Sequence, residues 1–330
     1  MSFGRHAVQR RRFTLAACAT TLLPFGRAQA QAWPERPVKW VLSQPPGSGP
    51  DNIARLLSER LGKGWGQAVV IDNKPGGQNT IGALAAARSA PDGHNFYFAT
   101  TAALVTNSYL FKTLPYDARQ DFVPVAFIAK SPFALLVETN SPIRSIEDLI
   151  ARAKAAPGKL SLGNEGPRAF SGMIARLFNA RAKIETNLVS YASVGVAVQD
   201  TIGGHVDAVL ADLASTAALA RQGRLRVLAV TSGKRVAGWD NAPALAELLP
   251  GFEMVGWFAL VAPTGTPAAV VQKVNHDLNA LLADREMAER INGLGPIAEP
   301  GATPEQVGEF LRVEHQRWAQ AAREIGLLPE

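Results

Sequence analysis

The sequence segment 43–51, SQPPGSGPD, has the composition of a backbone-lined anion site. Its glycines let backbone N–H groups converge, and the first N–H groups of a following helix have no partner within that helix. The helix dipole adds about half a positive charge at the same place. Candidate contacts are Pro46, Gly47, Ser48 and Gly49. Asp51 is also a candidate, chiefly by accepting N–H bonds that fix the loop, and an ordinary strand-to-helix turn remains the alternative.

A second segment, LGNEGPRA at 162–169, repeats this design further along the chain. Two such loops suggest that one ligand is bound between them, at the carboxyl ends of strands. The candidates here are Asn164, Gly166, Arg168 and Ala169. Arg168 can form a forked pair with a carboxylate, although an arginine beside a helix start also suits a solvated surface. Asp212 follows another apolar run and fits either a ligand contact or a helix cap.

Patterns for catalysis or metal binding are missing from the sequence. It has no G-x-S-x-G or G-x-x-x-x-G-K-[ST] motif, and Asn52 stands where a third glycine would complete G-x-G-x-x-G. His94, His205, His276 and His315 lie in separate segments without ligand spacing. We therefore predict no catalytic residue, no metal site and no cofactor.

The elements that position these loops follow from hydrophobic periodicity. Short apolar runs alternate with segments whose apolar residues recur three and four apart, which indicates an α/β protein with parallel sheets and crossover helices. The predicted strands cover residues 38–42, 69–71, 96–100, 134–137, 160–162, 187–190, 208–210, 226–230 and 257–261.

Prolines and glycines mark the helix ends. Pro50, Pro167, Pro267 and Pro304 each suit a first helical position, where the missing N–H costs nothing. Helix stops are expected at 203–204 and at Gly223.

Two long apolar stretches, 124–137 and 252–261, are candidates for paired crossover segments between two lobes. The first lobe would hold residues 33–130 plus 256–330, and the second would hold residues 131–255.

The first 30 residues have the parts of a cleavable export signal: Arg10-Arg11-Arg12, an apolar run and a small-residue site, with cleavage expected near residues 30–32. The arginines also fit a twin-arginine signal, and Cys18 is a weaker candidate for lipidation. Loss of residues 1–30 removes five arginines and no acid, so the net charge falls from +6 to +1. This near-neutral body gives no electrostatic argument for nucleic acid or an anionic membrane as a partner.

Cys18 is the only cysteine, so the mature chain would have no disulfide. A periplasmic location and a monomeric state are expected.

Short motifs in a fixed order extend this interpretation. They are WPERPV at 33–38, PPG at 45–47 with Asp51, DNKPGG at 72–77, APDG at 90–93, LPYD at 114–117, DFVPV at 121–125 and GGHVD at 203–207. From Trp33 to about Gly326, the chain resembles the extracytoplasmic solute receptors of tripartite tricarboxylate transporters, also called the Bug family.

The resemblance implies a type II periplasmic-binding-protein fold, with two lobes that close over a small carboxylate in the cleft between them. It also implies integral-membrane permease subunits as partners. The family's ligand-contacting loops map onto 46–50, the turn 76–81, the pair Thr100 and Thr101, the loop 164–169, and Asp212. Within the turn, the candidate contacts are Gly77, Gln78, Asn79 and Thr80.

Departures from the family pattern concern the solute more than the fold. The usual G-S-x-G-x-G-S is GNEGPRA at 163–169, an expected histidine is Gly172, and a usual glycine is Ser48. If Arg168 faces the cleft, its charge favours a ligand with two carboxylates. The alternatives are a receptor that presents its closed form to a sensor kinase and an exported α/β enzyme. The solute, its affinity and the export route are not encoded in recognisable motifs.

Overall fold

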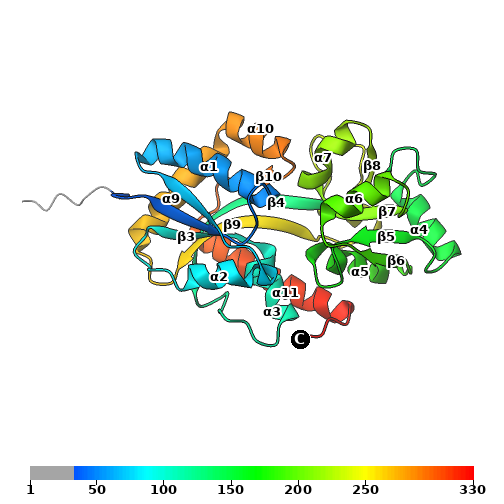
Figure 1. Ribbon diagram of the computed structural model, residues 1–330, viewed down its shortest axis with the longest axis horizontal. Coiled ribbons are helices and arrows are strands. Elements are labelled where there is room, and N and C mark those ends of the chain that lie inside the picture. Colours follow the sequence, from blue (N-terminus) through cyan, green and yellow to red (C-terminus); the bar gives the residue numbers. More distant parts are fainter. Residues whose placement is uncertain (1–32) are drawn as a thin grey trace, which may run out of the picture. The chain divides into compact units, whose positions relative to one another are not determined.

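The computed structural model describes residues 33–330, and Pro34–Glu330 form one compact unit (Figure 1). The expected export signal and its Cys18 lie outside the described residues. Among the residues described, no helix combines the length and apolar character that a membrane crossing requires.

A mixed sheet runs through this unit in the strand order β2-β1-β3-β9-β4-β7-β5-β6, and β8 and β10 each pair with β4. The strands are β1 (Val38–Leu42), β2 (Val69–Asn73), β3 (Asn95–Thr100), β4 (Phe122–Glu138), β5 (Ser161–Asn164), β6 (Asn187–Ser190), β7 (Ala208–Asp212), β8 (Leu225–Val230), β9 (Val255–Pro263) and β10 (Ile297–Ala298). Each predicted strand is confirmed in place, while β10 was not predicted because two residues carry no periodic signal.

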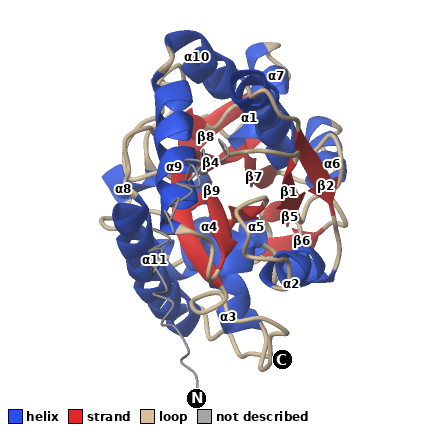
Figure 2. Ribbon diagram, turned by 90° about the vertical axis from the view of Figure 1, so that its left-hand side faces the viewer, coloured by secondary structure: helices blue, strands red, loops and turns tan. Residues whose placement is uncertain are grey.

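One part of the sheet contains β1, β2 and β3, which pair in parallel as expected. Helices lie on both faces of the sheet (Figure 2). α1 contacts β2 and α9, whereas Ala83 of α2 and Trp318 of α11 share one core cluster with Val41 and Tyr97. The helical segments of this part are α1 (Gly49–Trp65), η1 (Gly77–Asn79), α2 (Thr80–Ala87), η2 (Ala102–Thr106), α3 (Asn107–Leu110), α9 (Ala268–Ala283), α10 (Arg285–Gly293) and α11 (Pro304–Glu324).

The other part contains β5, β6 and β7, again paired in parallel. Its helices are α4 (Ile146–Ala155), α5 (Phe170–Ala182), α6 (Val194–Ile202), α7 (Leu213–Arg221) and α8 (Leu245–Leu248). A strand, a loop and a helix therefore occur in the same order in both parts of the sheet, which is what the two glycine-containing segments predicted.

Strands β4 and β9 connect the two parts (Figure 1). Residues 122–132 of β4 pair antiparallel with β9, and from Phe133 onward β4 pairs with β7 and β8. The predicted pairing of the two long apolar stretches is confirmed. Both faces of β4 and β9 are buried, which explains why the sequence of each strand is continuously apolar and does not alternate between apolar and polar residues.

Two expectations require correction. The sheet is not all parallel, because β9, β4 and β10 run antiparallel to their neighbours. Pro167 does not begin a helix, since α5 begins at Phe170. There the Asn164 side chain accepts the Gly166 N–H and the Ala169 N–H bonds the Gly166 carbonyl, so a turn occupies the residues before the helix.

Other helix ends agree with the sequence. Pro50 lies in the first turn of α1, and Pro304 begins α11 after a Thr303 cap. Pro267 is the cap of α9, one residue before its start. The glycines Gly204 and Gly223 follow α6 and α7 with φ of 73° and 71°, a conformation that glycine adopts without strain.

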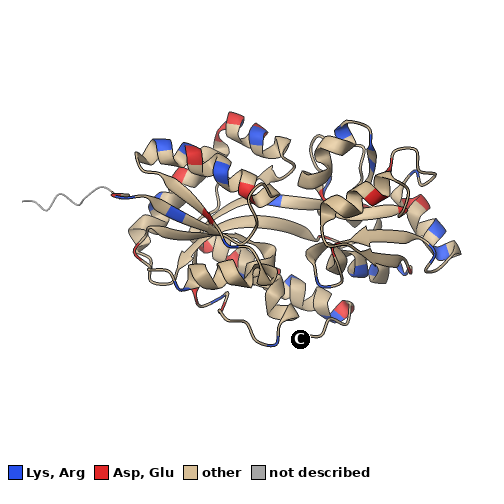
Figure 3. Cartoon of the chain, viewed as in Figure 1, with Lys and Arg blue, Asp and Glu red and all other residues tan. Residues whose placement is uncertain are grey.

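Acidic and basic residues are interspersed along α1, α4 and α10 (Figure 3). Several form pairs one helical turn apart, such as Glu59 with Lys63 at 2.7 Å and Asp148 with Arg152 at 2.8 Å. Such exposed pairs contribute little stability individually.

Candidate ligand-binding site

A cavity of about 930 Å³ lies where the two parts of the sheet meet. Its lining comes from the loop between β1 and α1, from η1, from the end of β3, from the middle of β4, from the start of β9, from the loop before α5, and from the junction of β7 with α7. Most of these segments are the carboxyl ends of parallel strands or the starts of helices, where open α/β sheets bind ligands.

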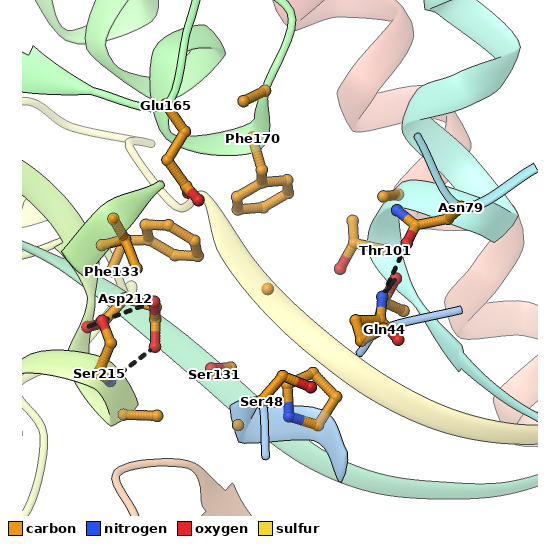
Figure 4. A pocket seen from close by; sticks show the side chains of 18 of the residues that line it. Gln44, Ser48, Asn79, Thr101, Ser131, Phe133, Glu165, Phe170, Asp212 and Ser215 are labelled. Atoms are coloured by element: carbon orange, nitrogen blue, oxygen red, sulfur yellow. Dashed lines mark hydrogen bonds between the residues drawn. The ribbon is translucent and has the colours of Figure 1, made fainter. Parts of the chain in front are cut away.

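One side of the cavity, which we call the α1 wall, consists of neutral polar groups. Gln44 Nε2 donates to Asn79 Oδ1 at 2.9 Å and to Thr100 Oγ1 at 3.4 Å. Thr101 Oγ1 accepts the Trp257 N–H at 3.0 Å. The α1 wall comprises Gln44, Ser48, Asn79, Thr100 and Thr101. Figure 4 labels all of them except Thr100.

Asp51 holds the loop of the α1 wall from beneath. Its side chain is 1% exposed and accepts hydrogen bonds from Gly47 N (2.8 Å), Arg55 Nε (2.9 Å) and Asn73 Nδ2 (2.9 Å). Burial by itself would raise the pKa of Asp51, but these bonds outweigh it and the pKa is lowered. The structure thus shows the loop-fixing bonds expected of Asp51, and its carboxylate does not line the cavity.

The η1 turn is held in an unusual conformation beside the same wall. Gln78 and Asn79 have φ of 51° and 75°, which non-glycine residues seldom adopt. Asn107 Nδ2 donates to the Gln78 carbonyl at 2.8 Å and helps to hold the turn. Gln44 Oε1 and Asn107 Oδ1 are buried without a hydrogen-bond partner in the described part of the chain. Both residues line the cavity.

The other side of the cavity, which we call the acid wall, comprises Phe133, Glu165, Phe170, Asp212 and Ser215 (Figure 4). Asp212 caps α7, because its carboxylate accepts Ser215 N and Ser215 Oγ, both at 2.8 Å. Burial raises the pKa of Asp212. Burial also raises the pKa of Glu165, and the negative charge of Asp212 raises it further.

Arg168 lines the cavity, but other groups of the chain engage its guanidinium. It donates to the Leu110 carbonyl, forms an ion pair with Glu330 at 3.0 Å and lies over the Phe111 ring at 6.0 Å. These contacts give no support to the expectation that Arg168 offers a free fork to a second carboxylate.

Trp257 is among the residues that line the cavity, and a buried acid binds its indole. Its indole Nε1 donates to Glu314 Oε2 at 2.9 Å, and Glu314 also pairs with Arg317 at 2.9 Å. Glu314 is 2% exposed, and burial raises its pKa above the ordinary value of 4.5.

This raised pKa predicts a pH-dependent effect of Glu314→Gln. The folded state disfavours ionised Glu314, so the wild type loses this part of its stability as pH rises from the unfolded pKa through the folded one. Glutamine cannot ionise and still accepts the indole N–H. We expect the variant to gain stability relative to wild type as pH rises above about 4.5, as measured by urea unfolding. The exposed Glu286→Gln is the control, and equal trends in both variants would contradict the assignment.

Most residues predicted from the sequence meet at this cavity. Those that line it are Gly47, Ser48, Gly49, Gln78, Asn79, Thr100, Thr101, Gly166, Arg168, Ala169 and Asp212. Pro46, Asp51, Gly77, Thr80 and Asn164 are adjacent to it without lining it. Asn164 is buried, because its side chain turns back to Gly166 N and the Leu162 carbonyl.

Sequence reasoning missed the lining residues Phe133, Phe170 and Trp257, and it did not name Glu165 individually. Glu165 lies inside the loop that the glycines marked, so its position was available as a signal. The aromatic residues resembled ordinary core residues, since nothing local separates a ring that packs from a ring that lines a cavity.

Within residues 33–330, no group of three or more His, Cys, Asp or Glu residues is placed to hold a metal ion. His94 and His315 are buried in separate places. The pKa of His315 is lowered to about 4, first because burial disfavours the charged ring and second because of Arg119.

Comparisons with known proteins agree with this geometry. A family model described as "Tripartite tricarboxylate transporter family receptor" matches residues 53–327. A UPF0065 protein of Bordetella bronchiseptica is 36% identical over 313 residues, which are 94% of this chain and 93% of that protein.

Solved structures are similar over nearly the same extent. R. palustris Rpa4515 with adipate has a TM-score of 0.81 and 31% identity, covering 90% of this chain and 100% of the other. Periplasmic binding protein BugD has a TM-score of 0.78 and 30% identity, with the same coverage. The fold is thus the two-lobed α/β fold of periplasmic binding proteins, and the relatives are receptors and not enzymes. The chain belongs to the tripartite tricarboxylate transporter receptor family.

Proposed function

We propose that this protein is a periplasmic receptor that captures a small organic carboxylate in the cavity between the α1 wall and the acid wall. The observation that carries the proposal is the convergence of two strand-to-helix loops, 44–50 and 165–169, on one cavity. Each loop brings backbone N–H groups and a helix start toward the same space, where a carboxylate can be bound without a basic side chain. The similar R. palustris protein holds adipate, a small carboxylate.

Two lobes that move relative to one another would give this site its mechanism. We take residues 33–130 plus 256–330 as the first lobe and 131–255 as the second. The change of partners along β4 near Phe133 supports this division. A ligand that contacts both walls stabilises the closed arrangement only by the difference between its affinities for the closed and open states.

The proposed cellular role is delivery of the bound solute to integral-membrane permease subunits after export of the chain and removal of its first 30 or so residues. Support comes from the family description, which names a transporter receptor, and from the similarity to a periplasmic binding protein. The partner would recognise the closed form, because only that form reports a bound solute.

The proposed function predicts a rise in unfolding temperature that grows with the concentration of one class of carboxylate. A ligand present at about 100 times its Kd adds about 2.7 kcal/mol to the free energy of unfolding. The measurement is a thermal-shift screen of the purified protein against monocarboxylates, dicarboxylates, tricarboxylates, amino acids and aromatic acids. The active compound should be recovered unchanged.

A cavity-blocking variant makes this test specific. Ala192 is exposed at the cavity lining, so Ala192→Trp should weaken binding of the active compound. Ala90 is also exposed but does not line the cavity, and Ala90→Trp should bind as wild type does. If no carboxylate stabilises the folded protein, or if a compound is turned over, the proposed function is wrong.

A further inference from the structure

Acidic residues outnumber basic ones among the charged residues that line the cavity. They are Glu165, Arg168 and Asp212, and the Arg168 guanidinium is engaged by Leu110 and Glu330. Two carboxylates therefore lie at the cavity without a basic side chain of the lining that is free to neutralise them. A second carboxylate of a ligand would meet repulsion at this wall.

Asp212 and Glu165 also accept hydrogen bonds from the first turns of α7 and α6. These bonds do not use all the acceptor positions of the two carboxylates. Asp212 accepts from one residue, Ser215, and Glu165 accepts from the Val194 N–H and weakly from Ser171 Oγ at 3.4 Å. An ionised carboxylate has about four lone-pair positions. The raised pKa values of both groups agree with charges that are partly buried and lack a cationic partner.

Two aromatic rings complete the acid wall. Phe133 and Phe170 both line the cavity, and their ring centroids are 5.0 Å apart at an interplanar angle of 43°. Figure 4 shows the two rings near Glu165, with Asp212 below the Phe133 side chain. Aromatic faces attract cations, and carboxylates accept N–H bonds from them. Together these groups have the chemistry of an ammonium site.

The α1 wall differs in chemistry. It carries amides and hydroxyls, and its acid, Asp51, is bound beneath the loop by three donors. Figure 4 shows Gln44 and Asn79 on the side of the cavity opposite Asp212 and Glu165. Hydroxyl and amide donors suit a carboxylate, so the side of the cavity opposite the two acids favours the opposite charge.

We propose that the solute is a zwitterion, with its carboxylate at the α1 wall and an ammonium group at the acid wall between Glu165 and Asp212. This inference rests on the proposed receptor function and names its substrate class. It separates this chain from the similar R. palustris protein that holds the dicarboxylate adipate.

Three pairs of compounds test the inference. Each pair shares one methylene chain and differs only in whether the second end is a carboxylate or an ammonium group: succinate and β-alanine, glutarate and γ-aminobutyrate, and adipate and δ-aminovalerate. Titration calorimetry at neutral pH measures each Kd with the full purified protein. For at least one chain length, the amino acid should bind about 10- to 100-fold tighter than its partner.

Asp212→Asn and Glu165→Gln should each reduce this preference about tenfold or more, while the shape of the side chains is kept. Asp284→Asn is matched to Asp212→Asn, because Asp284 caps α10 through Met287 N and lies outside the cavity lining. Glu247→Gln is matched to Glu165→Gln, because Glu247 accepts Ala244 N at the start of α8. Both control variants should keep the preference of the wild type.

The outcomes separate the two proposals. Tighter binding of dicarboxylates, or binding of other carboxylates with no binding of any amino acid of the pairs, overturns the zwitterion inference and leaves the receptor function standing. An unchanged preference in Asp212→Asn and in Glu165→Gln also overturns it. If no carboxylate of any kind binds, both proposals fail.

Discussion

Replacement of Gly172 by alanine is expected to destabilise the protein and to disrupt the loop of the acid wall. A Cβ at this position would lie 1.8 Å from the Gly166 carbonyl oxygen and 2.6 Å from its carbon. The obstacle is backbone, so either α5 or the turn with Gly166 must move. Overpacking of this kind costs about 1–3 kcal/mol or more. Affinity for the solute should fall at least about tenfold, because Gly166, Arg168 and Ala169 line the cavity.

Gly195→Ala is the matched control for this variant. Gly195 also lies near the start of a helix, α6, but a Cβ there would have no neighbour within 4 Å. Alanine should therefore stabilise this helix by up to about 1 kcal/mol. Urea unfolding and calorimetry distinguish the two variants, and equal stability of Gly172→Ala and wild type would mean that the close approach of α5 to the loop is absent in solution.

Asp51→Ala is expected to have the second large effect, because it removes one acceptor from three donors at once. Gly47 N, Asn73 Nδ2 and Arg55 Nε would lose their common partner. Unsatisfied buried donors and a broken charged network cost about 2–4 kcal/mol, a range that allows for the half-exposed Arg55. Solute affinity should also fall, since Gly47, Ser48 and Gly49 line the cavity.

The effect of Asp51→Ala should depend on pH in a defined direction. The pKa of Asp51 is lowered from its ordinary value of 3.8, so its contribution is present above that value and is lost as pH falls through the folded pKa. The stability difference between wild type and variant should therefore shrink below about pH 4.

Asp148→Ala is the control for Asp51→Ala. Asp148 likewise accepts a backbone N–H and an arginine Nε one helical turn away, but on α4 and outside the cavity lining. A smaller loss of stability and unchanged solute binding are expected. If Asp148→Ala weakens binding as much as Asp51→Ala does, the effect is not specific to the loop.

Gly172, Glu165 and Asp212 connect stability to recognition at the acid wall. Gly172 shapes the loop that carries Glu165, and Asp212 caps the helix beside it. The preference of the site for an ammonium group over a second carboxylate would therefore depend on Glu165 and Asp212, which also accept hydrogen bonds from the first turns of helices. Such dual roles explain why Asp212 could be interpreted from the sequence as either a cap or a ligand contact.

The sequence by itself determined the elements and the two loops. Periodicity located the strands, and prolines and glycines located most helix ends, because these features depend on neighbours within a few residues. The approximate positions of 44–50 and 164–169 followed for the same reason. Where a local turn competed with the helix, as at Pro167, the prediction was wrong by three residues.

Only the tertiary structure decided which side chains share the cavity. Glu165 and Asp212 meet because β5 and β7 are neighbours in the sheet, and Phe133 joins them because β4 changes partners at that residue. The guanidinium of Arg168 is engaged by Leu110 and Glu330, which come from distant parts of the chain. Strand order and long-range pairing are set by the packing of the whole core, and local sequence patterns carry no record of them.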